Sequence, residues 1–275
     1  VREDGRHELV TVFESISLAD ELSLSAIDGP EDEVVCPGVE GPNLVAAALR
    51  ALRAAGWDAP PVRVEVEKRI PVAAGLGGGS ADAAAALRLA EGLDPLGPGL
   101  AERIARELGA DVPAQLVPGV SLGTGAGEVV EPLPPLSEHA FVIVPQPFAL
   151  STPEVYREAD RLDLPRPDLS AWHDRLGAAL GPGVALPSEL MINDLEGAAV
   201  SLAPAVEHAL EAVQAAGADR ALVCGSGPTV AGIFWGGDAE GRAQRAAEAL
   251  IASHPGATAA VPVPSGTSGT IAFGK

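Results

Sequence analysis

The stretch with the clearest chemical potential is residues 71–81, which read Pro-Val-Ala-Ala-Gly-Leu-Gly-Gly-Gly-Ser-Ala. Glycine permits positive φ angles and lets the backbone approach a ligand closely. A helix that begins in such a turn presents unpaired N–H groups and the positive end of its dipole to an anion, and Ser80 adds a hydroxyl there. The stretch therefore predicts a phosphate-binding turn, with a plain linker or hinge as the alternative.

The sequence around this turn predicts the elements that hold it. Residues 62–68 alternate apolar and polar side chains, as a half-buried strand does, and residues 79–92 are rich in helix formers. The turn is not a Walker A motif, because no Gly-Lys-Ser/Thr follows, and its spacing differs from the G-x-G-x-x-G fingerprint of dinucleotide-binding proteins. We therefore expect a strand-to-helix phosphate turn of another kind.

A candidate catalytic carboxylate follows this helix. Asp111 lies just beyond a second helix predicted over residues 99–109, between Gly109 and Pro113, which restrict the backbone on both sides. An aspartate in this place is most often a cap or a turn former. The local rigidity nevertheless makes Asp111 a candidate for catalysis, and the glycines within residues 119–130 predict a hairpin after it.

The chain as a whole predicts an α+β protein of two domains, residues 1–145 and 146–275. Pro153 at the first helical position, with Thr152 as cap, predicts a helix early in the second half. The other expected helices are residues 44–55 with Asn43 as cap, a helix from about residue 170, helical segments over 193–216 and a helix over 238–253. The other expected strands are residues 10–16, 21–27, 140–144, 257–263 and 269–273, and residues 220–234 are expected to form strand, tight turn, strand.

Composition limits the function classes. Of the 275 residues 47% are hydrophobic, and the net charge of −20 disfavours binding to nucleic acid or to an anionic membrane. No stretch approaches the uncharged run of about 18 apolar residues of a transmembrane helix, and no signal segment opens the chain, so we expect a cytoplasmic protein. Cys36 and Cys224 lie far apart in unrelated contexts, which favours neither a disulfide framework nor a zinc cluster.

Several separate blocks of the sequence resemble the motifs of the GHMP kinases, the family of galactokinase, homoserine kinase and mevalonate kinase. The glycine turn resembles their P-x-x-x-G-L-G phosphate loop, and Gly-Ser-Gly-Pro-Thr at residues 225–229 resembles the second glycine turn of the isoprenoid branch of the family. The matching blocks, in the order of the family, are residues 4–9, 68–71 with the glycine turn, 108–113, 152–156, 193–196 and 225–229.

The resemblance implies a two-domain fold. The N-terminal domain would be a ribosomal-protein-S5-like α/β domain and the C-terminal domain a ferredoxin-like α+β domain, with the active site in the cleft between them. The reaction implied is ATP-dependent phosphorylation of a hydroxyl group on a small molecule that carries cytidine diphosphate. ATP and Mg²⁺ would be the cofactors, and no protein ligand of the metal is assigned. Nucleic acid and membrane partners are not expected, and the protein would be a monomer or a weak homodimer.

The resemblance also implies roles for individual residues. Asp111 would be the general base that takes the proton of the substrate hydroxyl. Asn43 and Lys68 would lie near the adenosine. The ATP phosphates would be held by the turn itself, which comprises Pro71, Val72, Ala73, Ala74, Gly75, Leu76, Gly77, Gly78, Gly79, Ser80 and Ala81.

On the side of the acceptor substrate, His7 would hydrogen-bond the cytosine and Tyr156 would stack on it. Arg6 stands where the family usually has an aromatic residue, and its guanidinium plane can also stack on a base. The complete set of implied substrate-binding residues is Arg6, His7, Thr152, Tyr156, Gly225, Ser226 and Gly227.

Two alternatives stay open at this point. The family's first motif, a strand whose lysine assists the catalytic aspartate, would precede residue 1, and we expect the chain to be truncated at its start, since it begins with Val1. Without that lysine the protein would be an impaired nucleotide-binding module. The other alternative keeps the fold and changes the substrate, which would make the protein a GHMP kinase for another small alcohol, such as homoserine or a mevalonate derivative.

Overall fold

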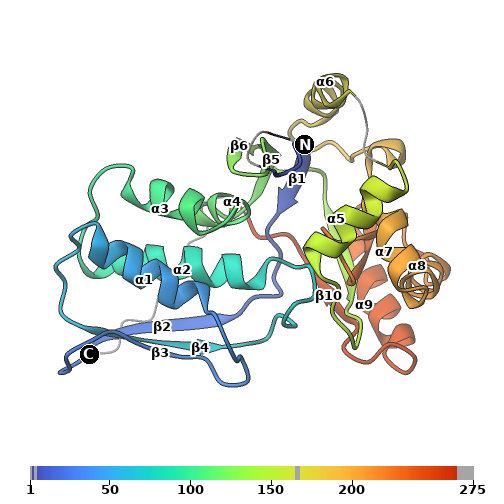
Figure 1. Cartoon of the computed structure of the whole chain (residues 1–275). Coiled ribbons are helices and arrows are strands. Elements are labelled where there is room, and N and C mark those ends of the chain that lie inside the picture. Colours follow the sequence, from blue (N-terminus) through green and yellow to red (C-terminus); the bar gives the residue numbers. More distant parts are fainter. Residues whose placement is uncertain (1, 3–4, 165–167, 265–275) are drawn as a thin grey trace. The chain divides into compact units, whose positions relative to one another are not determined.

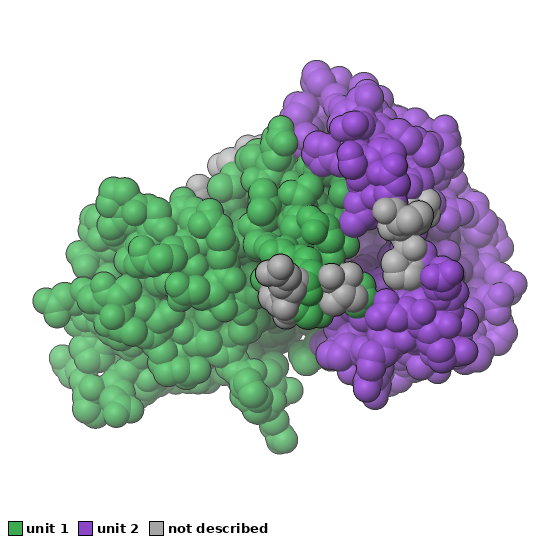
Figure 2. Space-filling model, turned by 45° about the horizontal axis from the view of Figure 1, so that its top comes forward, with its two compact units in different colours: residues 1–72, 77–132, 264–275 green, residues 73–76, 133–263 purple. Residues whose placement is uncertain are grey.

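The computed structural model describes residue 2, residues 5–164 and residues 168–264. These residues form two compact units (Figure 2). Unit 1 consists of the described residues up to Val72, Gly77–Pro132 and Pro264, and unit 2 of Ala73–Leu76 and Leu133–Val263. The chain therefore leaves unit 1 in the middle of the glycine turn, returns four residues later, and leaves again after Pro132.

Unit 1 contains two three-stranded sheets with strand orders β1-β5-β6 and β2-β4-β3. In the second sheet β4 is the central strand, antiparallel to β2 and parallel to β3, and α1 and α2 run over one face of this sheet (Figure 1). The elements are β1 (Thr11–Glu14), β2 (Glu21–Ala26), β3 (Glu33–Val35), α1 (Leu44–Ala54), β4 (Val62–Glu67), α2 (Gly78–Leu93), α3 (Leu100–Leu108), α4 (Val112–Leu116), β5 (Val120–Thr124) and β6 (Val129–Leu133).

The alternation of side chains along β4 fixes its orientation in the sheet. Val62, Val64 and Val66 are buried, whereas Glu65 and Glu67 are exposed. The buried face packs against the apolar sides of α1 and α2, and each buried valine contributes about 1.5–3 kcal/mol relative to an exposed one. This core sets the position at which β4 delivers the chain into the glycine turn.

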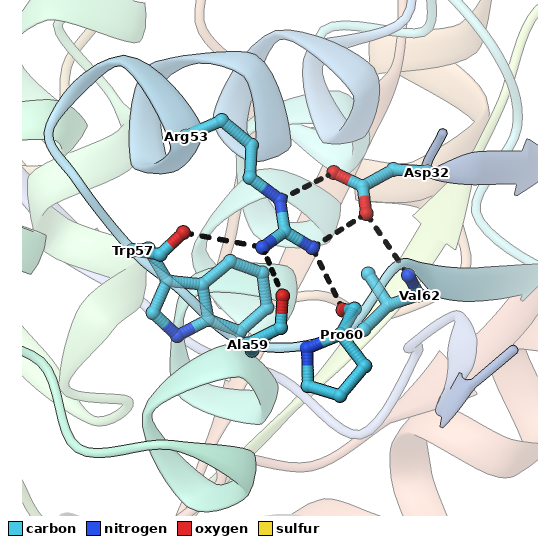
Figure 3. A network of polar contacts seen from close by, with 6 residues as sticks. All are labelled: Asp32, Arg53, Trp57, Ala59, Pro60 and Val62. Carbon is cyan, nitrogen blue, oxygen red and sulfur yellow. Dashed lines mark hydrogen bonds and ion pairs between the residues drawn. The ribbon is translucent and has the colours of Figure 1, made fainter. Parts of the chain in front are cut away.

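The beginning of β4 is fixed by Arg53 near the end of α1 (Figure 3). Its Nε and Nη2 donate to the two carboxylate oxygens of Asp32 at 3.0 and 2.7 Å, and Asp32 Oδ1 also accepts the N–H of Val62 at 2.9 Å. The guanidinium carbon of Arg53 lies 4.4 Å from the centroid of the Trp57 ring. The other N–H donors of Arg53 bond to backbone carbonyls, those of Trp57, Ala59 and Pro60.

Unit 2 is built on a four-stranded antiparallel sheet of order β10-β7-β9-β8. The order of its strands along the chain corresponds to 4-1-3-2, the arrangement of a ferredoxin-like split βαβ fold. The elements are β7 (His139–Val144), α5 (Thr152–Arg161), α6 (Leu169–Ala179), the 3₁₀ turn η1 (Ser188–Leu190), α7 (Glu196–Leu202), α8 (Ala205–Ala215), β8 (Arg220–Val223), β9 (Val230–Trp235), α9 (Ala239–Leu250) and β10 (Thr258–Ala260).

The core of unit 2 is made of many small side chains on the sheet, α8 and α9. Gly232 on β9 shows how closely these layers approach, because a Cβ there would lie 2.5 Å from Val213 Cγ1 and 2.9 Å from Val142 Cγ1. Alanine, valine and glycine thus permit the short sheet-to-helix distance that larger side chains would prevent.

The structure corrects the sequence predictions at four places. Three short elements were missed, α4, β3 and η1, and Ser151 rather than Thr152 is the N-cap of α5, with Pro153 in the second helical position. The strand expected at residues 269–273 lies outside the described residues. The remaining expected helices and strands are present. Across the part of the chain that the structure describes, no helix has the length and apolarity that crossing a membrane requires.

Candidate functional site

The middle of the glycine turn belongs to unit 2, where it packs against the second glycine turn. Gly75 has φ +81°, and a Cβ at this position would lie 2.5 Å from the carbonyl oxygen of Gly227 and 2.8 Å from that of Cys224. Thr229 N–H donates to the carbonyl of Ala74 at 3.3 Å. No other amino acid fits at Gly75 without displacing backbone, so the two glycine-rich sequences form one structure.

The second glycine turn, residues 225–229, is hydrogen-bonded to α7 and to the residues before it. Asn193 Nδ2 donates to the carbonyls of Val223 and Gly225 at 2.8 and 2.7 Å, and Glu196 accepts the N–H of Val223. The hydroxyl of Thr152, on α5, is 2.8 Å from that of Ser226. The sequence block at residues 193–196 therefore positions the turn that residues 225–229 form.

The end of the glycine turn belongs to unit 1, where it begins α2. Gly77 is the N-cap residue of this 16-residue helix and has φ +67°. Because glycine has no side chain, it cannot bond to the first N–H groups of the helix as a serine or aspartate cap does. Those N–H groups, from Gly78 to Ser80, are the donors that an anion would use.

Asp111 is the N-cap residue of α4, the short helix that sequence reasoning missed. Asp111 is exposed to solvent. The surrounding protein nevertheless raises the pKa of its carboxyl above the usual range through desolvation. A carboxylate that is reachable from solvent and has a raised pKa is suited to accept a proton at neutral pH.

The segment with Arg6 and His7 is fastened to the β5–β6 hairpin of unit 1. Leu9 N–H donates to the carbonyl of Gly125 at 2.7 Å, and Arg2 Nη1 donates to Glu128 at 2.9 Å. In the same hairpin, a Cβ on Gly127 would lie 3.5 Å from Ala110, the residue before Asp111. The hairpin thereby links the N-terminal segment to the surroundings of Asp111.

Lys68, at the end of β4, makes a contact that the sequence did not indicate. Its Nζ lies 2.5 Å from Asp20 Oδ2 and 2.8 Å from Asp82 Oδ2, and the side chains of both aspartates are buried. Lys68 Nζ is also 3.4 Å from the place of a Cβ on Gly78. Lys68 thus joins two carboxylates at the beginning of α2.

Asn43 occupies the cap of α1 as predicted, with Oδ1 accepting the N–H of Val45 at 2.8 Å. Its side chain also contacts the thiol of Cys36, whose pKa is raised by burial and by the nearby carboxylate of Asp82. Asn43, Cys36 and the ionic cluster are therefore neighbours within unit 1.

The predicted residues are divided between the two units, and within unit 1 Asn43 and Lys68 lie by the ionic cluster, whereas the segment with Arg6 and His7 lies on the β5–β6 hairpin. Tyr156 is half-buried on α5 in unit 2. The sequence did not indicate the contacts of Asp20 and Asp82, and it indicated Asn193 only as a member of the matching block at residues 193–196. Asp82 follows the glycines by three residues, and this proximity was the signal that could have identified it.

Comparison with known proteins identifies the family. The model of the GHMP kinase N-terminal domain matches residues 43–119, and that of the C-terminal domain matches residues 175–255. The 4-diphosphocytidyl-2-C-methyl-D-erythritol kinase of Streptomyces avermitilis is 42% identical over 281 residues, which cover 97% of this chain and 93% of that protein. The chain belongs to the 4-diphosphocytidyl-2-C-methyl-D-erythritol kinases, a family of GHMP kinases.

Other members of the 4-diphosphocytidyl-2-C-methyl-D-erythritol kinase family agree with this assignment. The enzyme of a Nocardioides species is 39% identical over 268 residues, which cover 92% of this chain and 89% of that protein. A crystal structure of a 4-(cytidine 5'-diphospho)-2C-methyl-D-erythritol kinase is 36% identical, with a TM-score of 0.74 and coverage of 95% of this chain and 92% of that chain. The expected GHMP kinase fold and family are confirmed.

A homoserine kinase from Cytophaga hutchinsonii also has this fold, with a TM-score of 0.67 and coverage of 92% of this chain and 89% of that one. Its identity to this chain is 20%, so it shows the shared fold alone. The identities of 39% and 42% to the two named relatives are what favour the cytidyl-substrate branch over the alternatives with homoserine or mevalonate.

Proposed function

We propose that this protein transfers the γ-phosphoryl group of ATP to a hydroxyl of 4-diphosphocytidyl-2-C-methyl-D-erythritol. The observation that carries the proposal is the identity of about 40% to named kinases of this substrate over nearly the whole chain. The geometry of the two glycine turns and of Asp111 supports it independently.

The glycine turn and the first turn of α2 are the proposed site of the ATP phosphates. Gly77 has no side chain and leaves the helix without a side-chain cap, so the N–H groups of Gly78 and Gly79 and the hydroxyl of Ser80 can donate to phosphate oxygens. When bound, ATP supplies the phosphoryl group and Mg²⁺ neutralises its charge. Asn43 and Lys68 are proposed to lie near the adenosine.

Asp111 is the proposed general base. As the substrate hydroxyl attacks, its proton passes to the carboxylate, and the bond between the substrate oxygen and phosphorus forms while the bond from phosphorus to ADP breaks. Desolvation favours this role, since it raises the pKa of Asp111 and so makes the carboxylate a stronger base.

The cytidine group is the part of the substrate that distinguishes this reaction from those of other GHMP kinases. We propose that His7 hydrogen-bonds the base, that Arg6 and Tyr156 offer planar groups for stacking, and that Thr152 and the turn at residues 225–227 hold the substrate. The cytoplasmic location, the monomer or weak homodimer and the domain boundaries at residues 145 and 146 stay predictions.

The experiment that tests the proposal is a coupled assay of ADP release by the protein expressed from its complete reading frame. We expect turnover with the cytidyl substrate and none with homoserine, and we expect Asp111→Asn to lower kcat by about 10²–10⁴. His7→Ala serves as the matched substrate-side variant, with a raised KM for the cytidyl substrate and an unchanged KM for ATP. Absence of turnover, or full activity of the Asp111→Asn variant, contradicts the proposal.

A further inference from the structure

The ionic cluster of Asp20, Lys68 and Asp82 lies at the base of the glycine turn, and all three groups belong to unit 1. The exposed fractions of the side chains are 2% for Asp20, 14% for Lys68 and 8% for Asp82. Removal of three charges from water costs several kcal/mol per ion, which mutual attraction only partly offsets. A gain in stability therefore does not explain why these three charged residues are buried together.

Each member of the cluster contacts a different side of the turn. Asp20 Oδ1 accepts the N–H groups of Arg69 and Ile70 at 2.5 and 2.8 Å, while its Oδ2 accepts Lys68 Nζ. Asp20 thus fixes the backbone that leads into the turn. Lys68 Nζ then reaches Asp82 in the first turns of α2, the helix that leads out of it.

The two sides are also in direct contact. A Cβ on Gly78 would lie 3.0 Å from Ile70 Cγ2 and 3.4 Å from Lys68 Nζ, so the first residue of α2 rests against the residues that precede the turn. The cluster closes the base of the loop formed by residues 71–77, because it bonds to the backbone before the loop and to the helix after it.

The charges of the cluster respond to this arrangement. Burial opposes ionisation of Asp20, but hydrogen bonds from Lys68, Ile70 and Arg69 outweigh it and lower the pKa of Asp20. Burial raises the pKa of Asp82 to about 6, with the Asp20 carboxylate adding to the effect and Lys68 opposing it. Asp82 Oδ1 is buried and accepts no hydrogen bond from any described residue, which is a cost of about 1–3 kcal/mol.

We propose that Asp20 and Asp82 are positioning residues for the phosphate-binding turn, which they hold in shape through Lys68. The inference rests on the proposed function and adds two residues to it. Neither carboxylate touches the nucleotide; they act by fixing the backbone N–H groups at the beginning of α2. Loosening of the base of the loop then misplaces these donors, and affinity for phosphate falls.

The test compares Asp82→Ala with Asp82→Asn and with Asp32→Ala. Asn at position 82 can still accept a hydrogen bond from Lys68, whereas Ala cannot. Asp32 pairs with Arg53 at the other end of β4 and is the matched control for loss of a partly buried carboxylate. The readouts are the Kd for Mg·ADP by calorimetry and the hydrogen exchange of the amides of residues 72–78, both on the full chain under conditions where every variant is folded.

We expect Asp82→Ala to weaken Mg·ADP binding by about tenfold or more and to speed amide exchange in the loop. Asp82→Asn should restore most of both, and Asp32→Ala should change neither. Equal or tighter nucleotide binding by Asp82→Ala, with unchanged loop exchange, would overturn the inference. If the wild-type protein binds no nucleotide, the proposed function fails, while loop exchange in the same variants still decides whether Asp82 positions the turn.

Discussion

The two ends of strand β4 carry ionic networks that differ in completeness. At its beginning, Arg53 uses its five N–H donors on Asp32 and on three carbonyls, and no donor of this guanidinium is left over. At its end, Lys68 joins Asp20 and Asp82, and one buried oxygen of Asp82 accepts no bond from a described residue.

The difference teaches which network serves which purpose. Complete hydrogen bonding repays the desolvation of Arg53 and Asp32, so that network stabilises the connection from α1 to β4. The cluster at the other end is costlier for stability and lies beside the turn that would bind phosphate. We interpret the first as structural and the second as part of the functional site.

The largest expected effect comes from Arg53→Met, which removes the centre of the complete network. It leaves the Asp32 carboxylate and three carbonyls without their donors, and we expect a loss of about 3 kcal/mol in the free energy of unfolding. Denaturant unfolding measures this loss. Nucleotide affinity of the folded variant should be unchanged, and a large loss of affinity would mean that the two ends of β4 are coupled.

The next effect is the pH dependence of stability, which should differ between Asp82 at the end of β4 and Asp32 at its beginning. Because the pKa of folded Asp82, about 6, exceeds its unfolded value of 3.8, this group favours folding below pH 4, and the contribution is lost as the pH rises through 6. The pKa of Asp32 is lowered, first by its hydrogen bond from Arg53, so its contribution is present at neutral pH and is lost as the pH falls below 4.

Unfolding free energies of the wild type, Asp82→Asn and Asp32→Asn measured from pH 4 to pH 7.5 test this contrast. Relative to the wild type, Asp82→Asn should gain on the order of 2 kcal/mol as the pH rises, whereas Asp32→Asn should be most damaging at neutral pH. Parallel curves for the wild type and Asp82→Asn would show that Asp82 has the same charge in the folded and the unfolded protein over this range. The titratable groups that interact with Asp82 are Asp20, Lys68 and Cys36.

The smallest effect concerns the ring that lies against Arg53. Trp57→Phe keeps an aromatic face for the guanidinium but removes the indole N–H, which donates to the carbonyl of Asp94 at 3.3 Å. We expect a loss of about 1 kcal/mol in stability and no change in nucleotide affinity. A loss as large as that of Arg53→Met would show that the ring, rather than Asp32, carries the network.

Sequence patterns were sufficient for the framework of the protein. The alternation in β4 and the alanine-rich composition of α2 report directly on burial, and Asn43 caps α1 as its residue type suggests. The short helix α4 was missed because five residues that contain a proline carry no periodicity.

The functional site was predicted only in part, for a physical reason. The glycine turns can be recognised in the sequence because a positive φ and close backbone contact require glycine, as at Gly75. Asp20 and Asp82 are separated by many residues in the chain and meet only through Lys68. A tertiary ion cluster of this kind leaves no local spacing to recognise.

The path of the chain through the glycine turn has a consequence for attempts to divide the protein. Residues 73–76 belong to unit 2, although both neighbouring segments belong to unit 1. A fragment that begins at residue 133 would lack Ala74 and Gly75, on which the turn at residues 224–229 rests. The C-terminal half is thus not a self-contained module, and a version split in two would have to recover four residues from the other piece before its second glycine turn could take its shape.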